Sequence, residues 1–371
     1  MGGPHTATPA GLPRARGLGI PFAGAPGPAN AITDVPGVEL GHLTRIEGDA
    51  IRTGVTALHP RGRAGAGDPW VAGFHVQNGN GEMTGLAWMG ETGSAAGPIC
   101  LTNTHAVGIA HAGIIRWTVR THPRLAGAWL LPVASETWDG YLNDINGGHV
   151  TEEHVVAALD AARGGPVEEG SVGGGTGMNC YDFKGGSGTA SRRVGAYTVG
   201  VLVQANFGDR EELTIAGVPV GAALGDDNPM ADFFAPPGAG SVVAIVATDA
   251  PLLAHQCTAL ARRVTTGIAR TGTAGSHFSG DLFLALSTGN PRAFPTNAET
   301  LHGEGADRLG TLRFFPWGGL DPYFSAVVQA TEEAVLNALV ANAEMTGLDG
   351  HRTPALPRER VVALLRERGL G

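Results

Sequence analysis

Residues 271–281 read TGTAGSHFSGD, and this run of small residues joins a predicted helix to a predicted strand. Residues 251–270 (PLLAHQCTALARRVTTGIAR) have apolar side chains at a spacing near 3.6, which is typical of an amphipathic helix. Residues 281–287 (DLFLALS) form an apolar run of the kind expected for a buried strand. Because α/β proteins alternate helices and buried strands, this stretch predicts an α/β fold.

The rest of the chain continues this alternation of short apolar runs and amphipathic helices. Several predicted strands are apolar on both faces, as expected for a sheet that is covered from both sides. The length of 371 residues is compatible with one large domain or with two. The proline- and glycine-rich residues 1–35 are expected to form a loosely packed arm. The other predicted strands are 98–103, 127–134, 196–204 and 241–248, and the other predicted helices are 151–163, 324–344 and 357–368.

The composition argues against several classes of protein. The formal net charge is -9, so a nucleic acid is not an expected partner. The chain has no apolar run of about 18 residues, and its N-terminal stretch lacks the uninterrupted apolar region of a secretory signal, so we expect a cytoplasmic protein without a membrane span. The three cysteines are far apart and show no CxxC spacing, which argues against a disulfide framework or a zinc site.

The bond between Gly275 and Ser276 has the residue types that self-cleavage requires. The Ser276 hydroxyl can attack the carbonyl carbon of Gly275 and move the acyl group from nitrogen to oxygen, and hydrolysis of the ester then breaks the chain. A glycine lacks Cβ and so adopts the strained backbone that such an attack needs. A freed Ser276 would carry an α-amine with a pKa of about 7.7–8.0, which can accept the hydroxyl proton. From spacing alone, a simple Gly-Ser turn is the more economical interpretation.

Eight sequence blocks, in order, resemble the family of L-aminopeptidase/D-amidase-esterases (DmpA type) and β-peptidyl aminopeptidases, which are self-processing N-terminal-nucleophile-type hydrolases. The resemblance covers roughly residues 15–350. The blocks are ITDVPGVELGH (32–42), NGNGEMTGL (78–86), PICLTNTHAVG (98–108), ASETWDGYLNDING (134–147), GSVGGGTGMNCYDFKGGSGTASR (170–192), VLVQANFG (201–208), GSHFSGDLFLALSTGNP (275–291) and ATEEAVLNALVANAEMTG (330–347).

This resemblance implies an αββα-like four-layer sandwich and an enzyme that releases N-terminal amino acids from peptides, amides or esters. The substrate residue could be an L-, D- or β-amino acid, since the family includes all three. The resemblance also implies one domain, 1–371, that cuts itself into an α chain (1–275) and a β chain (276–371), which remain associated. It further implies a homo-oligomer, such as a tetramer of αβ pairs, and neither a metal nor an organic cofactor.

The resemblance assigns roles to individual residues. Ser276 matches the nucleophile, and Asn206 matches the asparagine whose side chain helps to hold the oxyanion. Glu136 matches the carboxylate that binds the free amine of the substrate, and Trp138 matches an aromatic residue that lines the site. Without the resemblance, Asn206 would be interpreted as a turn residue at the end of a strand. Glu136 would be interpreted as a member of a salt bridge at the end of a strand, and Trp138 as a tryptophan that only packs against its neighbours.

Thr331 and Glu333 match a hydroxyl–carboxylate pair near the amine of the nucleophile, although relatives often carry serine in place of Thr331. On a helix, Glu333 shares a face with apolar neighbours, while Glu332 points about 100° away and is expected in solvent. An inward carboxylate needs a partner, and the amine of Ser276 is a plausible one.

Other functions fit the sequence less well. No GxSxG or HExxH motif occurs, and the glycine-rich stretches 79–85 and 173–178 lack the full context of a phosphate-binding loop. Nylon-oligomer hydrolases and ornithine acetyltransferases have a similar fold but generally use threonine as the new N-terminus. An uncleaved, non-enzymatic binding protein is a further alternative. Two apparent insertions, 209–240 and 297–318, leave the substrate preference open.

Overall fold

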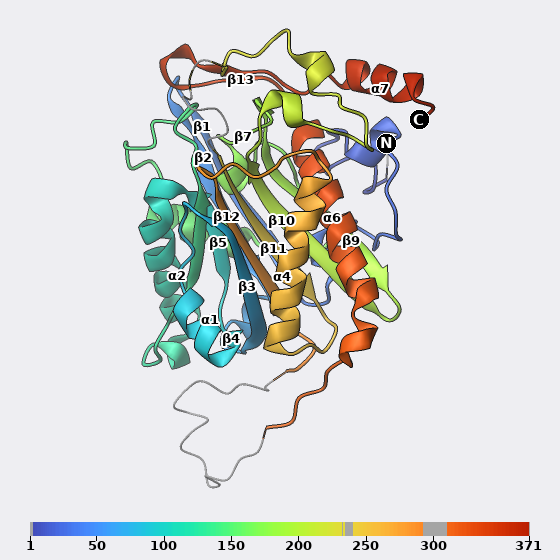
Figure 1. Ribbon diagram of the computed structural model, residues 1–371. Coiled ribbons are helices and arrows are strands. Elements are labelled where there is room, and N and C mark those ends of the chain that lie inside the picture. The colour runs from blue at the N-terminus through green and yellow to red at the C-terminus, as the bar shows by residue number, and fades with distance from the viewer. Residues whose placement is uncertain (1–2, 232, 234–239, 292–309, 371) are drawn as a thin grey trace.

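The computed structural model describes residues 3–231, 233, 240–291 and 310–370, and it contains two β-sheets packed between helices (Figure 1). One sheet has the strand order β1-β2-β5-β6, and the other has the order β4-β3-β12-β11-β10-β9. Helices α2 and α3 pack on the first sheet, and α4 and α6 pack on the second. The layers therefore run helix, sheet, sheet, helix, which confirms the predicted αββα sandwich. The main strands are β1 (Glu39–Glu47), β2 (Ile51–His59), β3 (Trp70–Gly79), β4 (Ser94–Ala95), β5 (Ile99–Asn103), β6 (Val133–Thr137), β9 (Gly186–Val194), β10 (Tyr197–Asn206), β11 (Ser241–Thr248) and β12 (Gly280–Ser287), and the helices are α1 (Leu86–Thr92), α2 (Val107–Thr121), α3 (Glu152–Ala161), α4 (Ala254–Ala269), α6 (Asp321–Val340) and α7 (Arg358–Glu367).

Strand β12 shows how one apolar run can serve two hydrophobic layers. Leu282 and Leu284 belong to the layer between the two sheets, together with Leu101 of β5. Phe283 and Ala285 belong to the layer between the second sheet and helices α4 and α6. Successive side chains of a strand point to opposite faces, so a strand between two apolar layers must be apolar throughout. This explains why residues 281–287 lack the alternation of a half-exposed strand.

The segment around Gly275 closes a crossover between two parallel strands. Strands β11 and β12 are parallel neighbours, with Ser241 opposite Gly280, and α4 connects them. Helix α4 ends at Ala269, so residues 270–279 return the chain to the beginning of β12. Gly275 has a φ of +78°, in the left-handed region that favours glycine. The glycine is exposed and Ser276 is half-buried, which leaves the bond between them near the surface.

Several predicted elements differ from the observed ones. The strand predicted at 127–134 is instead β6, which begins only at Val133, because Pro132 cannot donate to a strand ladder and Trp129 is 95% exposed. The helix predicted at 324–344 begins earlier, at Asp321, and ends at Val340. Strands β1, β2, β3 and β9 and helices α1 and α2 had no counterpart in the predicted elements.

The expectation of a loosely packed N-terminal arm is wrong. Ala15 and Ile20 are buried in the layer beneath α6, and Ile32 is buried between the sheets. Arg14 is 2% exposed, and its guanidinium forms an ion pair with the equally buried Glu169 at 2.6 Å. The proline and glycine content suggested flexibility, but these buried partners fix the segment.

The two apparent insertions are described in part. In 209–240, Leu213 and Val220 are fully buried, so this segment belongs to the core as well as to the surface. Residues 297–309 of the second segment lie outside the described residues. Among the helices that the structure describes, none is both long and apolar enough to cross a membrane.

Candidate active site

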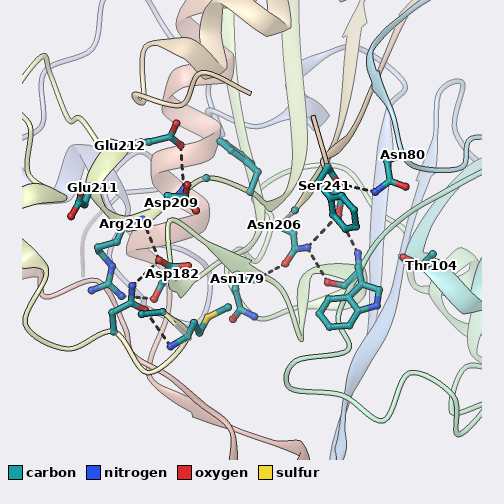
Figure 2. Close-up of a pocket in the computed structure, with 18 of the residues that line it drawn as sticks. Asn80, Thr104, Asn179, Asp182, Asn206, Asp209, Arg210, Glu211, Glu212 and Ser241 are labelled. Atoms are coloured by element: carbon teal, nitrogen blue, oxygen red, sulfur yellow. Dashed lines mark hydrogen bonds between the residues drawn. The ribbon is translucent and has the colours of Figure 1, made fainter. Parts of the chain in front are cut away.

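A cavity of about 640 Å³ opens where several strands end, and it brings together three of the predicted site residues (Figure 2). Glu136 lies on β6, Trp138 follows the same strand, and Asn206 is the last residue of β10. Ser241, opposite Asn206 at the beginning of β11, also lines this cavity. The ends of these strands therefore place a carboxylate, an indole and an amide around one cavity.

Glu136 is a buried carboxylate held by neutral donors. It is 2% exposed, and it accepts hydrogen bonds from the backbone N–H of Glu82 at 2.8 Å and from the hydroxyl of Thr104. Burial raises the pKa of Glu136, while these two hydrogen bonds act in the opposite direction. Within the described chain Glu136 has no ion-pair partner, so an ammonium group in the cavity would supply the missing charge.

The amide of Asn206 is held in a fixed orientation. Its Oδ1 accepts the backbone N–H of Asn179 at 2.8 Å. Its Nδ2 donates to the backbone carbonyl of Trp138 at 2.9 Å and to the Ser241 hydroxyl at 3.2 Å. Because both Nδ2 hydrogens already have acceptors, holding an oxyanion would require one of them to be redirected.

Ser276 lines a second cavity of about 220 Å³ that adjoins the first. The two cavities share Phe207, Gly208, Asp209 and Glu212 as lining residues. The chain is continuous through Gly275 and Ser276, so the nitrogen of Ser276 is a peptide nitrogen here. The loop that carries Ser276 (residues 270–279) and the Glu136 cavity are thus neighbours that meet along residues 207–212.

Two residues outside the predicted set hold the Ser276 loop in place. Asn78, on β3, donates from Nδ2 to the backbone carbonyl of Ser276 at 3.0 Å and to Asp281 Oδ2 at 2.7 Å. Asp281 also accepts the Ser279 hydroxyl at 2.5 Å. Burial raises the pKa of Asp281, and the hydrogen bonds from Ser279 and Asn78 oppose this shift. Both residues lie inside the sequence blocks 78–86 and 275–291, but no local pattern distinguished them there.

Comparison with known proteins assigns the chain to a family. The model of peptidase family S58 matches residues 30–353. The chain belongs to peptidase family S58. The β-peptidyl aminopeptidase BapA of Sphingosinicella microcystinivorans is 45% identical over 382 aligned positions, which cover 96% of this chain and 92% of the relative.

Solved structures of two aminopeptidases superpose on nearly the whole chain. The L-aminopeptidase D-Ala-esterase/amidase of Ochrobactrum anthropi, described as a variant of the Ntn hydrolase fold, has a TM-score of 0.89 and 44% identity and covers 96% of this chain and 99% of its own. A β-aminopeptidase of Burkholderia sp. has a TM-score of 0.86 and 47% identity, with the same coverage. The resemblance inferred from the sequence blocks is confirmed.

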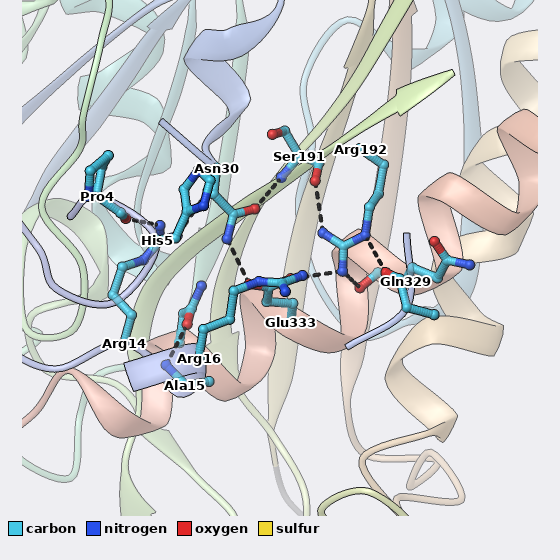
Figure 3. Close-up of polar contacts among 12 residues, drawn as sticks. Pro4, His5, Arg14, Ala15, Arg16, Asn30, Ser191, Arg192, Gln329 and Glu333 are labelled. Atoms are coloured by element: carbon cyan, nitrogen blue, oxygen red, sulfur yellow. Dashed lines mark hydrogen bonds and ion pairs between the residues drawn. The ribbon is translucent and has the colours of Figure 1, made fainter. Parts of the chain in front are cut away.

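In this S58 peptidase, Glu333 of α6 lies among polar residues of the N-terminal segment and of β9 (Figure 3). Its carboxylate is fully buried and contacts Arg16 at 2.6 Å, Arg192 at 2.7 Å and Asn30 at 2.6 Å. Burial alone would raise the pKa of Glu333, but the hydrogen bond from Arg16 and the charges of Arg192 and Arg16 outweigh it and lower the pKa. In the uncleaved chain two arginines supply the positive charge beside Glu333, and the expected pairing with the Ser276 amine stays a prediction.

Thr331 also lies apart from both cavities. It faces α4, where a Cβ placed on Gly267 would lie 2.5 Å from the Cβ of Thr331. Its hydroxyl is buried and has no hydrogen-bond partner among the described residues. Glu136, Trp138 and Asn206 thus line the cavity that adjoins the Ser276 loop, whereas Thr331 and Glu333 line neither cavity, and their proposed roles stay predictions.

Replacing Glu333 by glutamine tests whether this residue is structural. Glu333→Gln leaves Arg16 and the buried Arg192 without a countercharge, so we expect the free energy of unfolding to fall by about 3–5 kcal/mol. Urea denaturation monitored by circular dichroism measures this. The matched control is Glu332→Gln, which removes an exposed ion pair with Arg270 and should cost less than about 1 kcal/mol. Unchanged stability with lost activity in Glu333→Gln would instead support the catalytic role.

Proposed function

We propose that Ser276, freed from Gly275 by self-cleavage, is the nucleophile with which this enzyme releases N-terminal amino acids from peptides, amides or esters. Membership of peptidase family S58 and the similarity to aminopeptidases make the chain a serine-type hydrolase of this class. The observation that supports the proposed site is the position of Glu136. It is a buried carboxylate without an ion pair in the described structure, in the cavity that adjoins Ser276.

In the proposed reaction, Glu136 binds the ammonium group of the substrate and thereby fixes the position of the carbonyl to be attacked. The Ser276 hydroxyl attacks that carbonyl carbon while the α-amine of Ser276 takes the hydroxyl proton. The N–H of Asn206 stabilises the oxyanion. The amine then returns the proton to the leaving group, and water hydrolyses the resulting ester to release the amino acid.

Two features of the assembly and the cellular location are predictions. The fragments 1–275 and 276–371 are expected to stay together after cleavage, and pairs of fragments are expected to form a homo-oligomer. The location is expected to be the cytoplasm. Within the described residues, no group of three or more His, Cys, Asp or Glu side chains is arranged to hold a metal ion.

Substrates with free and blocked amines test this function directly. We expect the wild-type enzyme to hydrolyse aminoacyl p-nitroanilides of L-, D- or β-amino acids and to reject their N-acetyl forms. Glu136→Gln removes the charge that binds the ammonium and should lower kcat/KM for free amines by about 30-fold or more, corresponding to about 2 kcal/mol. Two groups are expected to shape the acid limb of the wild-type pH profile: the carboxylate of Glu136, whose pKa burial raises above its usual range, and the α-amine of Ser276. The contribution of Glu136 should be lost in the variant, while that of the amine should remain.

The matched control for this variant is Glu91→Gln, which removes a carboxylate from the exposed face of α1, outside both cavities. Its kcat/KM should equal that of the wild type. Equal hydrolysis of free and acetylated substrates by the wild type would contradict the proposed role of Glu136 and the assignment as an aminopeptidase.

A further inference from the structure

The large cavity has a strongly acidic side that the proposed reaction does not use. Four carboxylates line it, and we call them the acidic wall: Asp182, Asp209, Glu211 and Glu212. In Figure 2 they lie on one side of Asn206, while Thr104, which donates a hydrogen bond to Glu136, lies on the other. The acidic wall and Glu136 are thus at opposite ends of one cavity, with Asn206 between them.

Hydrogen bonds confirm this order along the cavity. The Oδ1 of Asn206 accepts from Asn179, which lies on the acidic side, and its Nδ2 donates to Trp138, two residues after Glu136. The chain then runs from Asn206 directly into the acidic wall at Asp209. Glu212 accepts the backbone N–H of Ala274 at 3.2 Å, two residues before Ser276. The acidic wall therefore begins beyond Asn206, on the side of the cavity away from Glu136.

Three of the four carboxylates of the acidic wall have no ion pair in the part of the chain that the structure describes. Asp182 accepts from Asn228 at 2.8 Å and from a backbone N–H, and Glu212 accepts from two backbone N–H groups. None of these donors is charged. Across the described chain, no ion pair involves Asp182, Glu211 or Glu212.

One arginine, Arg210, also lines this cavity, but its guanidinium points into the protein. It lies 3.5 Å from the centre of the Phe183 ring and donates to the backbone carbonyls of Tyr181 and Leu224 at 3.0 and 2.9 Å. Four carboxylates against one guanidinium leave this end of the cavity with a net negative charge. A bound cation would meet the three carboxylates of the acidic wall that form no ion pair in the described chain, although Asp182 is also attracted by the charge of Arg210.

Asn179 supplies an independent sign that this end of the cavity accommodates a hydrogen-bond donor. Its side chain lines the cavity between Asp182 and Asn206 (Figure 2) and is 9% exposed. Its Oδ1 has no hydrogen-bond partner in the part of the chain that the structure describes. A buried amide oxygen without a partner is costly, and a donor on a bound ligand would remove that cost.

We infer that the acidic wall binds a positively charged leaving group, so that the enzyme prefers amides whose departing amine carries a second cationic group, such as a lysine residue. This inference rests on the proposed function, because it takes the Glu136 end of the cavity as the site of the acyl residue. The volume of about 640 Å³ suits a ligand of dipeptide size. A leaving group with an extra carboxylate would be repelled by the same wall.

The test compares leaving groups that differ in charge at constant acyl residue. The substrates are L-alanyl and β-alanyl derivatives of Lys-NH2, Gln-NH2 and Glu-NH2, and the measured quantity is the release of alanine or β-alanine by the wild-type enzyme. We expect kcat/KM to be about tenfold higher for the lysine than for the glutamine substrate, and about tenfold lower for the glutamate substrate. Equal values for the three substrates would overturn the inference while leaving the proposed function intact. No release from any of them would count against the proposed function itself.

The double variant Asp182→Asn/Glu211→Gln assigns the preference to the acidic wall. These two residues are chosen because Glu212 and Asp209 lie beside the Ser276 loop and their replacement would disturb it. The lysine-to-glutamine ratio should fall to about twofold or less in the double variant and stay at its wild-type value in Glu91→Gln. A ratio that is unchanged in the double variant would overturn the inference.

Salt provides a second measurement that needs no variant. Raising the ionic strength from about 0.05 to 0.5 M should reduce the lysine-to-glutamine ratio of the wild type severalfold, because screening weakens attraction between charges. The rate for the neutral glutamine substrate serves as the internal reference. A lysine preference that does not respond to salt would show that packing, and not the acidic wall, selects the leaving group.

Discussion

Replacing Ser276 by alanine is expected to abolish both chain cleavage and hydrolysis. Without the hydroxyl, nothing at this position can attack the Gly275 carbonyl, and no nucleophile is released for substrates. The purified variant should run as a single band of 37.9 kDa, whereas the wild type should give fragments of about 28 and 10 kDa, from 275 and 96 of the 371 residues. Hydrolysis should fall by about 10⁴-fold or more.

The matched control is Ser325→Ala, which removes an exposed hydroxyl from α6. It should be cleaved and active like the wild type. Sequencing the N-terminus of the small wild-type fragment locates the cut, and a first residue other than Ser276 would contradict the proposal. Full hydrolysis by Ser276→Ala would move the nucleophile elsewhere in the chain.

Replacing Asn206 by aspartate is expected to give the second largest loss. The aspartate keeps the shape of the side chain and can still accept the N–H of Asn179, but it removes the N–H that would face the oxyanion. We expect kcat to fall by about 10²–10³-fold, with a much smaller change in KM, because the lost interaction forms only in the transition state.

Asn146→Asp is a suitable control, since it makes the same substitution at an exposed position outside both cavities. Activity must be normalised to the cleaved fraction on a denaturing gel, which separates slow maturation from slow hydrolysis. If Asn206→Asp raised KM and left kcat unchanged, Asn206 would bind substrate without stabilising the oxyanion.

Sequence patterns predicted the strands that are unbroken apolar runs, and missed strands whose sequences contain polar residues or glycines, including the largely buried β2 and β9. Strands β11 and β12 are fully buried and therefore appear as unbroken apolar runs. The edge strand β1 (ELGHLTRIE) is only partly buried, and its polar residues make its sequence look like that of a loop. The ion pair of Arg14 could not be predicted from local sequence either, because its partner Glu169 lies 155 residues away.

The site was predictable to the extent that its residues occur at the ends of recognisable strands. Glu136, Trp138 and Asn206 follow this rule, and the family resemblance named them. The surroundings of Glu333 could not be derived in the same way. Its helical face correctly indicated burial, but its partner Arg16 is separated by 317 residues and lies in a segment that local composition marked as loose.

The position of β12 in the six-stranded sheet has a consequence for the mature enzyme. This strand follows Ser276 but lies between β3 and β11, which precede it, and α6 packs on β9 and β10. Neither fragment alone would therefore contain a complete hydrophobic layer. If the bond is cut as proposed, unfolding would become dissociation of two molecules, and refolding would require a bimolecular encounter. The chain would then fold only once as a single covalent molecule, before it is cut. Afterwards the lifetime of the active enzyme would depend on how slowly it unfolds.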